Sequence, residues 1–345
     1  MRALIKTARG AGHLHVLETT SPRPGPGEAL VRIHQSGLCG TDLLIFDDVY
    51  RGRNRPVPCP LVVGHEAAGE VIELGPGTGG PAPGTRVGIE AVAGCGCCHH
   101  CLRGHYNLCA DWHHLGLTCA GLLADCAVIP VGSLLPLPAE VSFDDAAFLE
   151  PLATAVHTAE RVRPTPGMTA AIVGPGPLGL LHLLVLQAAG VGPIVVYGQD
   201  GDEKRLALAA SLGAEVALGD LRVIAVHANG VTQGRGFDIS IEAAGTSSAI
   251  QTALEIVSGH GTLVSLGIIR NTEIDVLQVM RKNLTWIGVV SSVRRHFAEA
   301  IALVHAGKVS PRRLITHRLP LAEALTGFEV LRHREAVKVM FTPRV

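Results

Sequence analysis

The chain has 345 residues, more than one hydrophobic core usually holds, so we expect two domains. Apolar residues make up 47% and charged residues 17%, a composition that excludes wholesale disorder. The 29 Lys plus Arg nearly cancel the 30 Asp plus Glu. The lack of a basic excess argues against a protein that coats nucleic acid.

The part of the chain before about residue 150 predicts a β-rich region, with short strands between turns rich in Pro and Gly. Met1–Lys6 carries two charges and has no long apolar core, so we interpret it as a strand and not as a signal peptide. Further strands are expected at Ala29–Ile33, Ala67–Leu74 and Ala124–Ile129. A β-rich first domain follows from this pattern.

From Ala170 onward, continuously apolar strands alternate with helices, which is typical of a parallel sheet covered on both faces. The expected elements are strand Ala170–Val173, helix Leu178–Ala189, strand Ile194–Tyr197, helix Glu203–Leu212, strand Ile239–Ala243, a helix near Ser248–Val257 and strand Gly261–Leu266. Ala170–Val196 imitates a membrane span, but a Gly-Pro-Gly-Pro turn interrupts it, so we expect no membrane segment. The tail predicts helix Phe297–Ala306, a segment Leu319–Leu331 and strand Ala336–Phe341.

A glycine turn follows the first of these strands. Gly174, Gly176 and Gly179 fit the pattern G-x-G-x-x-G between a predicted strand and a predicted helix, the context that a dinucleotide-binding turn requires. Pro177 and Leu178 open the helix, whose free N–H groups can face a pyrophosphate. The alternative is a Gly/Pro turn without a ligand.

An acidic residue is expected about 20 residues further on, where it binds the adenosine ribose. Asp200 is the candidate, and Asp202 and Glu203 follow it. A loop this acidic repels a 2′-phosphate, so NAD is favoured over NADP as cofactor. Lys204 and Arg205 act in the opposite direction, and Arg205 is also a candidate to bind the cofactor.

Five of the nine cysteines lie between Cys95 and Cys109. Cys95, Cys98, Cys101 and Cys109 have the spacing C-x2-C-x2-C-x7-C, which suits a structural zinc site with all four positions filled. Cys97 is interpreted as a bystander in this lobe of about residues 94–110. An iron–sulfur cluster and disulfides are the alternatives, and disulfides are disfavoured in a cytoplasmic chain.

A second candidate metal site is assembled from distant residues. Cys39, His65 and one carboxylate, from Glu66 or Glu150, would offer sulfur, nitrogen and oxygen, a three-ligand set that leaves one zinc position open for a substrate oxygen. Taken singly, each also has an ordinary structural interpretation. They fit a buried cysteine, a core histidine and a helix-start acid.

With these motifs in this order, the chain resembles the zinc-dependent medium-chain alcohol dehydrogenases. The resemblance rests on Gly37–Asp42, Gly64–Glu66, the cysteine lobe, Glu150–Leu152 and the glycine turn. It runs from Met1 to Phe341 and is strongest to the L-threonine 3-dehydrogenase and sorbitol (polyol) dehydrogenase branch.

The resemblance implies an α/β fold and a split chain. A GroES-like β-rich catalytic domain would comprise residues 1–152 and 291–345, with a Rossmann domain of residues 153–290 inserted between them. It also implies a homodimer or homotetramer. We expect a cytoplasmic protein, since the chain shows no export signal and carries many thiols.

The resemblance also implies a role for each matching residue. Cys39 and His65 would bind a catalytic zinc, with Glu66 or Glu150 as third ligand, and we expect Glu150. Asp42 would orient the imidazole, and Thr41 would hydrogen-bond the substrate oxygen. With the lobe zinc this makes two zinc ions per chain.

Two departures from the family pattern affect the chemistry. Leu44 stands where relatives carry a proton-relay histidine, so the proton needs a ribose hydroxyl with water, or His34. Gly198 stands at the usual position of the ribose-binding acid. Phe46, Asp48, Arg51, His113, His114 and Leu115 are candidates to line the substrate pocket or are ordinary surface and core residues.

The predicted function is oxidation of a secondary alcohol (a polyol, cyclitol or amino alcohol) to the ketone with NAD(P). The alternatives are a biosynthetic ketone reductase or aminocyclitol dehydrogenase on the same scaffold and, more distantly, a non-catalytic zinc- and nucleotide-binding protein. We expect a small-molecule substrate, and neither nucleic acid nor membrane as partner.

Overall fold

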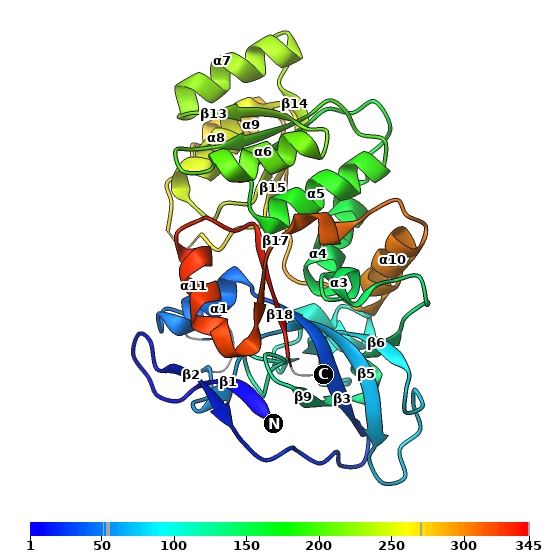
Figure 1. The fold of residues 1–345 in the computed structure, drawn as a ribbon. Helices are drawn as coiled ribbons and strands as arrows, with labels where there is room; N and C mark the ends of the chain where they lie inside the picture. Colours follow the sequence, from blue (N-terminus) through cyan, green and yellow to red (C-terminus); the bar gives the residue numbers. More distant parts are fainter. Residues whose placement is uncertain (51, 53–55, 270, 344–345) are drawn as a thin grey trace. The chain divides into compact units, whose positions relative to one another are not determined.

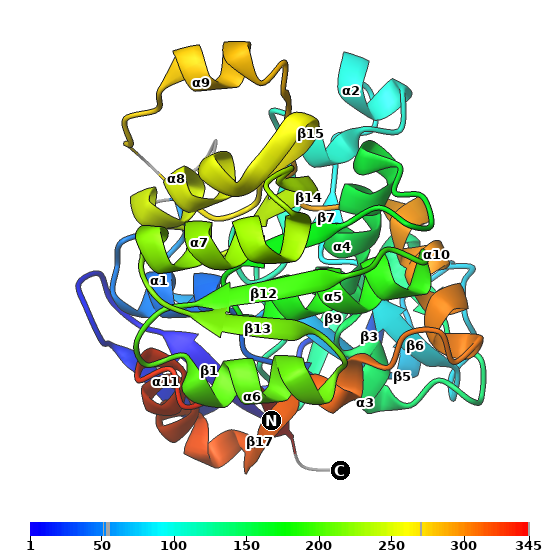
Figure 2. The ribbon, with the colours of Figure 1, turned by 90° about the horizontal axis from the view of Figure 1, so that it is seen from above.

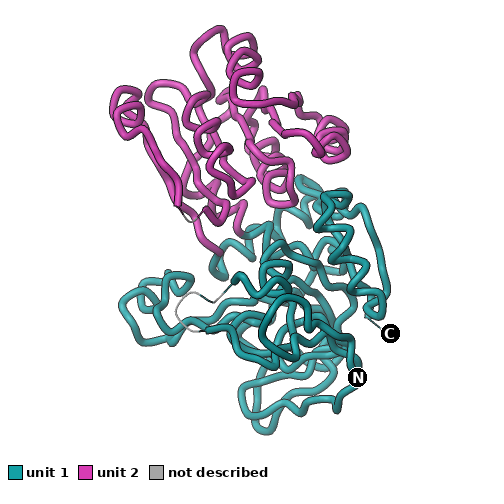
Figure 3. Tube along the Cα trace, turned by 90° about the vertical axis from the view of Figure 1, so that its left-hand side faces the viewer, with its two compact units in different colours: residues 1–153, 292–345 teal, residues 154–291 magenta. Residues whose placement is uncertain are grey.

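The computed structural model describes residues 1–50, 52, 56–269 and 271–343. The chain forms two compact units (Figure 3), of which unit 1 comprises Met1–Ala153 and Ser292–Val345 and unit 2 comprises Thr154–Ser291. No helix in the described part of the chain is long and apolar enough to cross a membrane.

Unit 2 is built on a six-stranded parallel sheet with the strand order β13-β12-β11-β14-β15-β16. Its strands are β11 Ala170–Val173, β12 Ile194–Gly198, β13 Glu215–Leu218, β14 Phe237–Glu242, β15 Val257–Ser265 and β16 Thr285–Gly288. Numbered within the unit, this order is 3-2-1-4-5-6, the arrangement of a doubly wound dinucleotide-binding fold. The order reverses next to β11, so the turn after β11 lies at the point where such folds bind ligands.

Helices cover both faces of this sheet (Figure 2). The helices of the unit are α5 Pro177–Ala188, α6 Glu203–Ser211, α7 Leu221–Thr232, α8 Ser247–Ile256 and α9 Val276–Arg281. Helices α7 and α8 pack on one face, where Ile224 and Leu254 join Val195 and Leu263 in a buried cluster. Helices α5 and α6 lie on the other face. Burial on both faces explains why the strands are apolar without alternation.

Four elements of unit 2 were not anticipated: β13, α7, α9 and β16. Helix α7 contains Asn229 and Gly230, which lower helix propensity, but the Asp220 carboxylate caps its first turn by accepting the N–H groups of Arg222 and Val223. Strand β13 is short and only partly buried. The weak local signals of these elements are overridden by packing against the rest of the sheet.

Unit 1 contains a seven-stranded sheet in the order β10-β6-β5-β3-β18-β17, with β9 also paired to β3, and a three-stranded sheet in the order β2-β1-β4. Strands β3, β5, β17 and β18 of the larger sheet are labelled in Figure 1. The strands are β1 Arg2–Lys6, β2 Leu14–Glu18, β3 Glu28–Gly37, β4 Leu61–Val62, β5 Glu66–Leu74, β6 Arg86–Ile89, β9 Cys126–Pro130, β10 Leu134–Pro136, β17 Ile315–Pro320 and β18 Lys338–Thr342. A small ribbon pairs β7 Val92–Ala93 with β8 His113–His114. Because β18 from the tail pairs with β3, the two separate chain segments form one sheet.

Helices of unit 1 flank these sheets. They are α1 Gly40–Phe46, α2 His99–Leu102, α3 Phe143–Ala146, α10 Arg294–His305 and α11 Ala324–Arg332. Helix α4 Leu149–Val162 begins in unit 1 and continues into unit 2. Short 3-10 turns span Tyr106–Leu108, Val131–Ser133, Pro311–Leu314 and Leu321–Glu323.

The tail differs in detail from the prediction. The segment Leu319–Leu331 is not one element, because β17 ends at Pro320 and α11 begins only at Ala324. Proline has no N–H for a ladder or a helix interior, which places the boundary there. The predicted last strand, Ala336–Phe341, is observed as β18 with a shift of one to two residues.

Candidate functional site

Cys39 lies between β3 and α1 and serves as the N-cap of that helix. The Asp42 carboxylate accepts the Cys39 N–H at 3.0 Å, so this acid fixes the backbone from which the thiol projects. The Thr41 Oγ1 lies 3.7 Å from the Cys39 Sγ. The sequence Cys-Gly-Thr-Asp thus folds into one helical turn that presents a thiol, a hydroxyl and a carboxylate together.

Three metal-ligating side chains meet in unit 1. One ligand atom each of Cys39, His65 and Glu66 lies within 4.8 Å of the others. Glu66 opens β5 and pairs with Gly37 at the end of β3, and His65 precedes it. Adjacent strands therefore bring together residues that are far apart in sequence.

The electrostatics of this group suit a divalent cation. The His65 Nδ1 lies 3.5 Å from the Asp42 Oδ1, and both atoms are buried without a hydrogen-bond partner among the described residues. Burial by itself would lower the pKa of His65, but the charges of Asp42 and Cys39 outweigh it and raise that pKa well above its usual value. A largely buried group of side chains that offers S, N and O donors fits Zn²⁺, with Asp42 placed to orient the imidazole.

Glu66 also makes a buried ion pair, with Lys338 of β18. The two side chains are 2% and 1% exposed, and the Lys338 Nζ donates to the Glu66 Oε2. Gly37 on the strand between them makes room, because a Cβ there would lie 2.5 Å from that oxygen and 2.7 Å from the Lys338 Cε. The lysine thus pairs with the carboxylate of the candidate metal site.

Glu150, the expected third ligand, is not a member of the three-residue group, and Glu66 stands in it instead. Glu150 lies in the first turn of α4 and is partly buried. Burial raises the pKa of its carboxyl to about 7; the charge of His65 opposes this shift and that of Glu66 adds to it. The carboxyl is therefore close enough to sense both residues electrostatically.

The other candidate residues lie in different surroundings. His114 is buried, and its ring meets that of His65 edge-on at a centroid distance of 5.2 Å. Burial, and next the charge of His65, lower the pKa of His114 to about 3, so its ring is neutral. His34, considered as a proton relay, stacks on Phe143 with ring centroids 4.2 Å apart. Arg51 lies outside the described residues.

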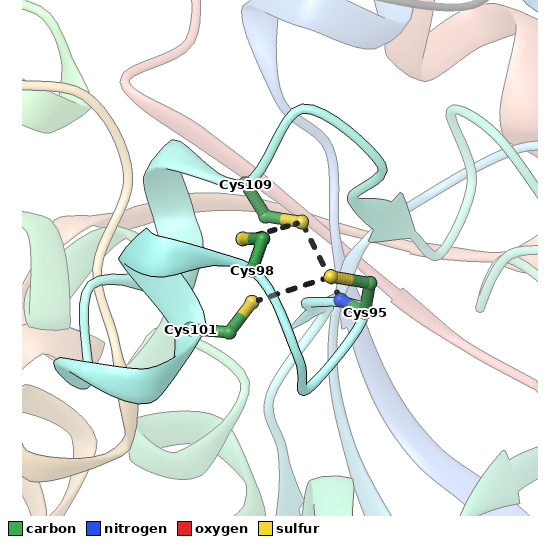
Figure 4. Close-up of side chains that lie close together, drawn as sticks. All are labelled: Cys95, Cys98, Cys101 and Cys109. Carbon is green, nitrogen blue, oxygen red and sulfur yellow. Dashed lines mark hydrogen bonds between the residues drawn. The ribbon is translucent and has the colours of Figure 1, made fainter.

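The four cysteines of the lobe face one another (Figure 4). The Sγ atoms of Cys95, Cys98, Cys101 and Cys109 all lie within 4.8 Å of one another. Cys95 and Cys101 are 3.9 Å apart, Cys98 and Cys109 are 3.8 Å apart, and the Cys95 N–H donates to the Cys109 Sγ at 3.4 Å. Four thiols that converge without forming a disulfide fit a tetrahedral zinc site.

The glycine turn joins β11 to α5 as predicted. Gly174 has φ +115°, and a Cβ there would lie 2.8 Å from the Ala244 N. A Cβ at Gly179 would lie 2.1 Å from the Gly174 O, whereas one at Gly176 would meet nothing within 4 Å. Gly174 and Gly179 thus allow tight packing, and Gly176 leaves open space over the helix N-terminus, where a pyrophosphate fits.

The acidic residue at the end of β12 is Asp202, whereas Asp200 is exposed. The Asp202 carboxylate accepts the Gln199 N–H at 3.2 Å and lies 3.7 Å from the Arg205 guanidinium. The loop after Gly198 therefore folds back, and its second acid returns to the strand end. Arg205 lies at the same strand end, because it pairs with Asp202.

Several buried charges were missed from the sequence, and Lys338 and Glu242 are two of them. Lys338 interrupts the apolar run Val337–Phe341, and a lone lysine in such a strand could have indicated a buried partner. Glu242 ends β14 and is fully buried, where its carboxylate accepts the N–H groups of Ala244 at 2.8 Å and Gly267 at 3.1 Å. That carboxylate organises the loops at the carboxyl end of the sheet.

Two protein-family models match the chain. The one described as "Alcohol dehydrogenase GroES-like domain" matches residues 25–139, and the one described as "Zinc-binding dehydrogenase" matches residues 177–306. These matches confirm the expected fold, a GroES-like β-rich domain with a Rossmann domain inserted.

Curated relatives align along the whole chain. A sorbitol dehydrogenase of Halalkalibacterium halodurans is 31% identical over 99% of both chains. An L-threonine 3-dehydrogenase of Pyrococcus horikoshii is 33% identical over 99% of this chain and 98% of that protein. The expected branch of the family is confirmed by these two relatives.

Solved structures agree. Alcohol dehydrogenase TADH from Thermus sp. ATN1 has a TM-score of 0.90 at 30% identity and covers both chains fully. A dehydrogenase (rspB) from E. coli complexed with NADH has a TM-score of 0.89 at 25% identity, and one from Sinorhizobium meliloti bound to NADP has 0.88 at 27%, each over 99% of both chains. The chain therefore belongs to the zinc-binding medium-chain alcohol dehydrogenase family and is an NAD(P)-dependent oxidoreductase of alcohols.

Proposed function

We propose that this enzyme oxidises a secondary alcohol that carries a second polar group on a neighbouring carbon, and that it uses NAD. The observation that carries this proposal is the convergence of Cys39, His65 and Glu66 within 4.8 Å, beside the Thr41 hydroxyl. Unit 1 would be the catalytic domain and unit 2 the nucleotide-binding domain.

Cys39 and His65 would hold a catalytic zinc together with Glu66, and Glu150 is kept as the carboxylate that takes part at another stage of turnover. Zinc in such a site supplies a Lewis acid that lowers the pKa of a substrate hydroxyl. Thr41 would accept the hydroxyl proton at its Oγ1 while it passes its own proton on to a ribose hydroxyl and water, and Asp42 would hold the His65 ring in place. Lys338 would keep the total charge around the site low.

In unit 2 the turn from Gly174 to Gly179 would bind the pyrophosphate through Gly176 and the free N–H groups of the helix, beginning at Leu178. Asp202 would accept hydrogen bonds from the adenosine ribose in place of Asp200. A carboxylate at this point repels a 2′-phosphate, which favours NAD over NADP. Arg205 would lie beside the adenosine.

The substrate class is supported by the relatives. Sorbitol and L-threonine, named in the two relatives, both carry a secondary hydroxyl next to a second polar group. We propose a polyol, cyclitol or amino alcohol for this chain. Ketone reduction is the second candidate direction, favoured by Leu44 at the relay position on α1, and rates measured in both directions separate the two.

The lobe cysteines would bind a second, structural zinc, which brings the count to two per chain. The enzyme would act as a homodimer or homotetramer. Support comes from the edge strand β16 and the adjacent α9, where Trp286, Val276 and Met280 are exposed. We place the enzyme in the cytoplasm, where a reducing environment would keep its cysteines available as zinc ligands.

The test is metal analysis of Cys39→Ser and His65→Ala proteins beside the parent enzyme, with an NAD-coupled panel of diols, cyclitols and amino alcohols. We expect two zinc ions per parent chain and one per variant, with at least a hundredfold lower kcat in each variant and unchanged thermal unfolding. A variant with parental zinc content and turnover would refute the catalytic zinc site.

A further inference from the structure

Cys97 is a fifth thiol in the lobe and is not needed for the four-thiol group. It is exposed, whereas Cys95, Cys98 and Cys101 are partly buried and Cys109 is buried. None of the proposed catalytic or cofactor contacts involves it.

The Cys97 Sγ lies 3.7 Å from the Cys95 Sγ. A disulfide needs these atoms at about 2.05 Å, so the two sulfur atoms have to approach each other by roughly 1.6 Å. The residue between them is Gly96, which has φ +78°, and a Cβ added there would meet no atom within 4 Å. No side chain at position 96 therefore stands in the way of closure.

Cys95 is also central to the four-thiol group. Its Sγ lies 3.9 Å from that of Cys101, and its N–H donates to the Cys109 Sγ. A sulfur that enters a disulfide no longer has the charge that binds a metal. Closing a bond to Cys97 would leave three thiols where four are needed.

We propose that Cys97 is an oxidation site, at which a peroxide converts Cys95 and Cys97 into a disulfide and thereby dismantles the four-thiol group. The exposed Cys97 thiol gives its proton to solvent, and its sulfur attacks the peroxide O–O bond, which gives a sulfenic acid and releases hydroxide (or the alkoxide of an organic peroxide). The Cys95 thiolate then attacks the Cys97 sulfur and expels hydroxide. Two sulfur atoms lose two electrons in total, and the peroxide gains them.

The test exposes the whole enzyme to stoichiometric hydrogen peroxide and compares the parent with Cys97→Ser. Peptide mass spectrometry reads the disulfide, and a metallochromic dye reads released zinc. We expect a loss of two hydrogens mapped to the Cys95–Cys97 peptide, release of one zinc per chain, and reversal of the disulfide by dithiothreitol. Cys97→Ser should release zinc at least tenfold more slowly.

Cys119→Ser is the matched control, because it removes a thiol outside the lobe and should behave as the parent does. Both variants should keep parental activity before oxidation. Equal zinc release from the parent and Cys97→Ser, or a disulfide mapped to other cysteines, would overturn the proposal. An enzyme purified without zinc in the lobe would contradict the proposed structural zinc site. The mass measurement would still test whether the Cys95–Cys97 disulfide forms.

Discussion

Lys338 shows how one residue constrains the site chemistry. It is the charged residue of β18, is 1% exposed, and meets a carboxylate that is itself 2% exposed. Removing one member of a buried pair leaves the other charge without compensation, which costs far more than losing an exposed pair. The lysine is therefore required wherever Glu66 stays ionised.

We predict that Lys338→Met lowers the free energy of unfolding by about 3–5 kcal/mol, and that Glu66→Gln/Lys338→Met recovers much of the loss. The matched control is Arg318→Met, which breaks the ion pair with Asp144 at a position 51% exposed and should lose about 0–1 kcal/mol. Urea denaturation measures all three. Equal losses of unfolding free energy in Lys338→Met and Arg318→Met would contradict the claim that burial makes the Lys338–Glu66 pair costly to break.

At the scale of elements, the turns between strands and helices position the functional groups. Helix α1 begins at Gly40, so that Cys39, Thr41 and Asp42 share its first turn. In the loop from β12 to α6, the Asp202 carboxylate at the helix start accepts the Gln199 N–H and so lies at the strand end. The fold of this loop thus sets which acid lies at the end of the strand.

This loop leads to a prediction about cofactor binding. Asp202→Asn should raise the KM for NAD about tenfold, because it removes the charge from a hydrogen bond to the ribose, while kcat changes little. Asp200→Asn, in the exposed part of the same loop, should change the KM less than twofold. Initial-rate kinetics decide between them, with thermal unfolding as the check on folding. A larger effect at Asp200 would make that residue the ribose-binding acid.

At the scale of the whole molecule, the tail ties distant parts of unit 1 together. Tyr106 of the lobe donates its hydroxyl hydrogen bond to Glu90, and the Arg294 backbone N–H of the tail donates to the Tyr106 oxygen. The Arg294 guanidinium lies 3.8 Å from Glu90 and donates to the Leu134 O at 2.9 Å. Lobe, sheet and tail therefore meet at one buried carboxyl.

Burial raises the pKa of Glu90 from 4.5 to about 7, although Tyr106 and Arg294 act to lower it. The folded chain then holds this proton over a pH range in which the unfolded chain has lost it, so stability falls as the pH rises through about 7. Glu90→Gln lacks this titration. We predict that its free energy of unfolding gains ~1 kcal/mol relative to the parent between pH 6 and pH 8.

Urea denaturation at several pH values measures this difference, and Glu70→Gln, on a partly exposed carboxylate, is the matched control. The free energy of unfolding of the control should change with pH as that of the parent does. If Glu90→Gln also follows the parent, the Glu90 carboxyl does not titrate in this range.

The sequence by itself determined the family, the reaction class, the order of domains and most strands of the parallel sheet. These features reside in local patterns: apolar strands, the glycine turn and the cysteine spacing. The short edge elements β13 and β16 and helix α9 escaped prediction because their local signals are weak and sheet packing decides them.

Tertiary structure decided which candidates meet. Spacing along the chain could not choose between Glu66 and Glu150, because strand pairing of β5 with β3 places Glu66 beside Cys39. It could not reveal Lys338 as the partner of Glu66, since 272 residues separate them. Spacing also could not show that Asp202, and not Asp200, lies at the end of β12, because the fold of the loop sets which acid returns there. Each of these contacts joins residues whose closeness depends on backbone geometry, and that geometry is not encoded in any short stretch of sequence.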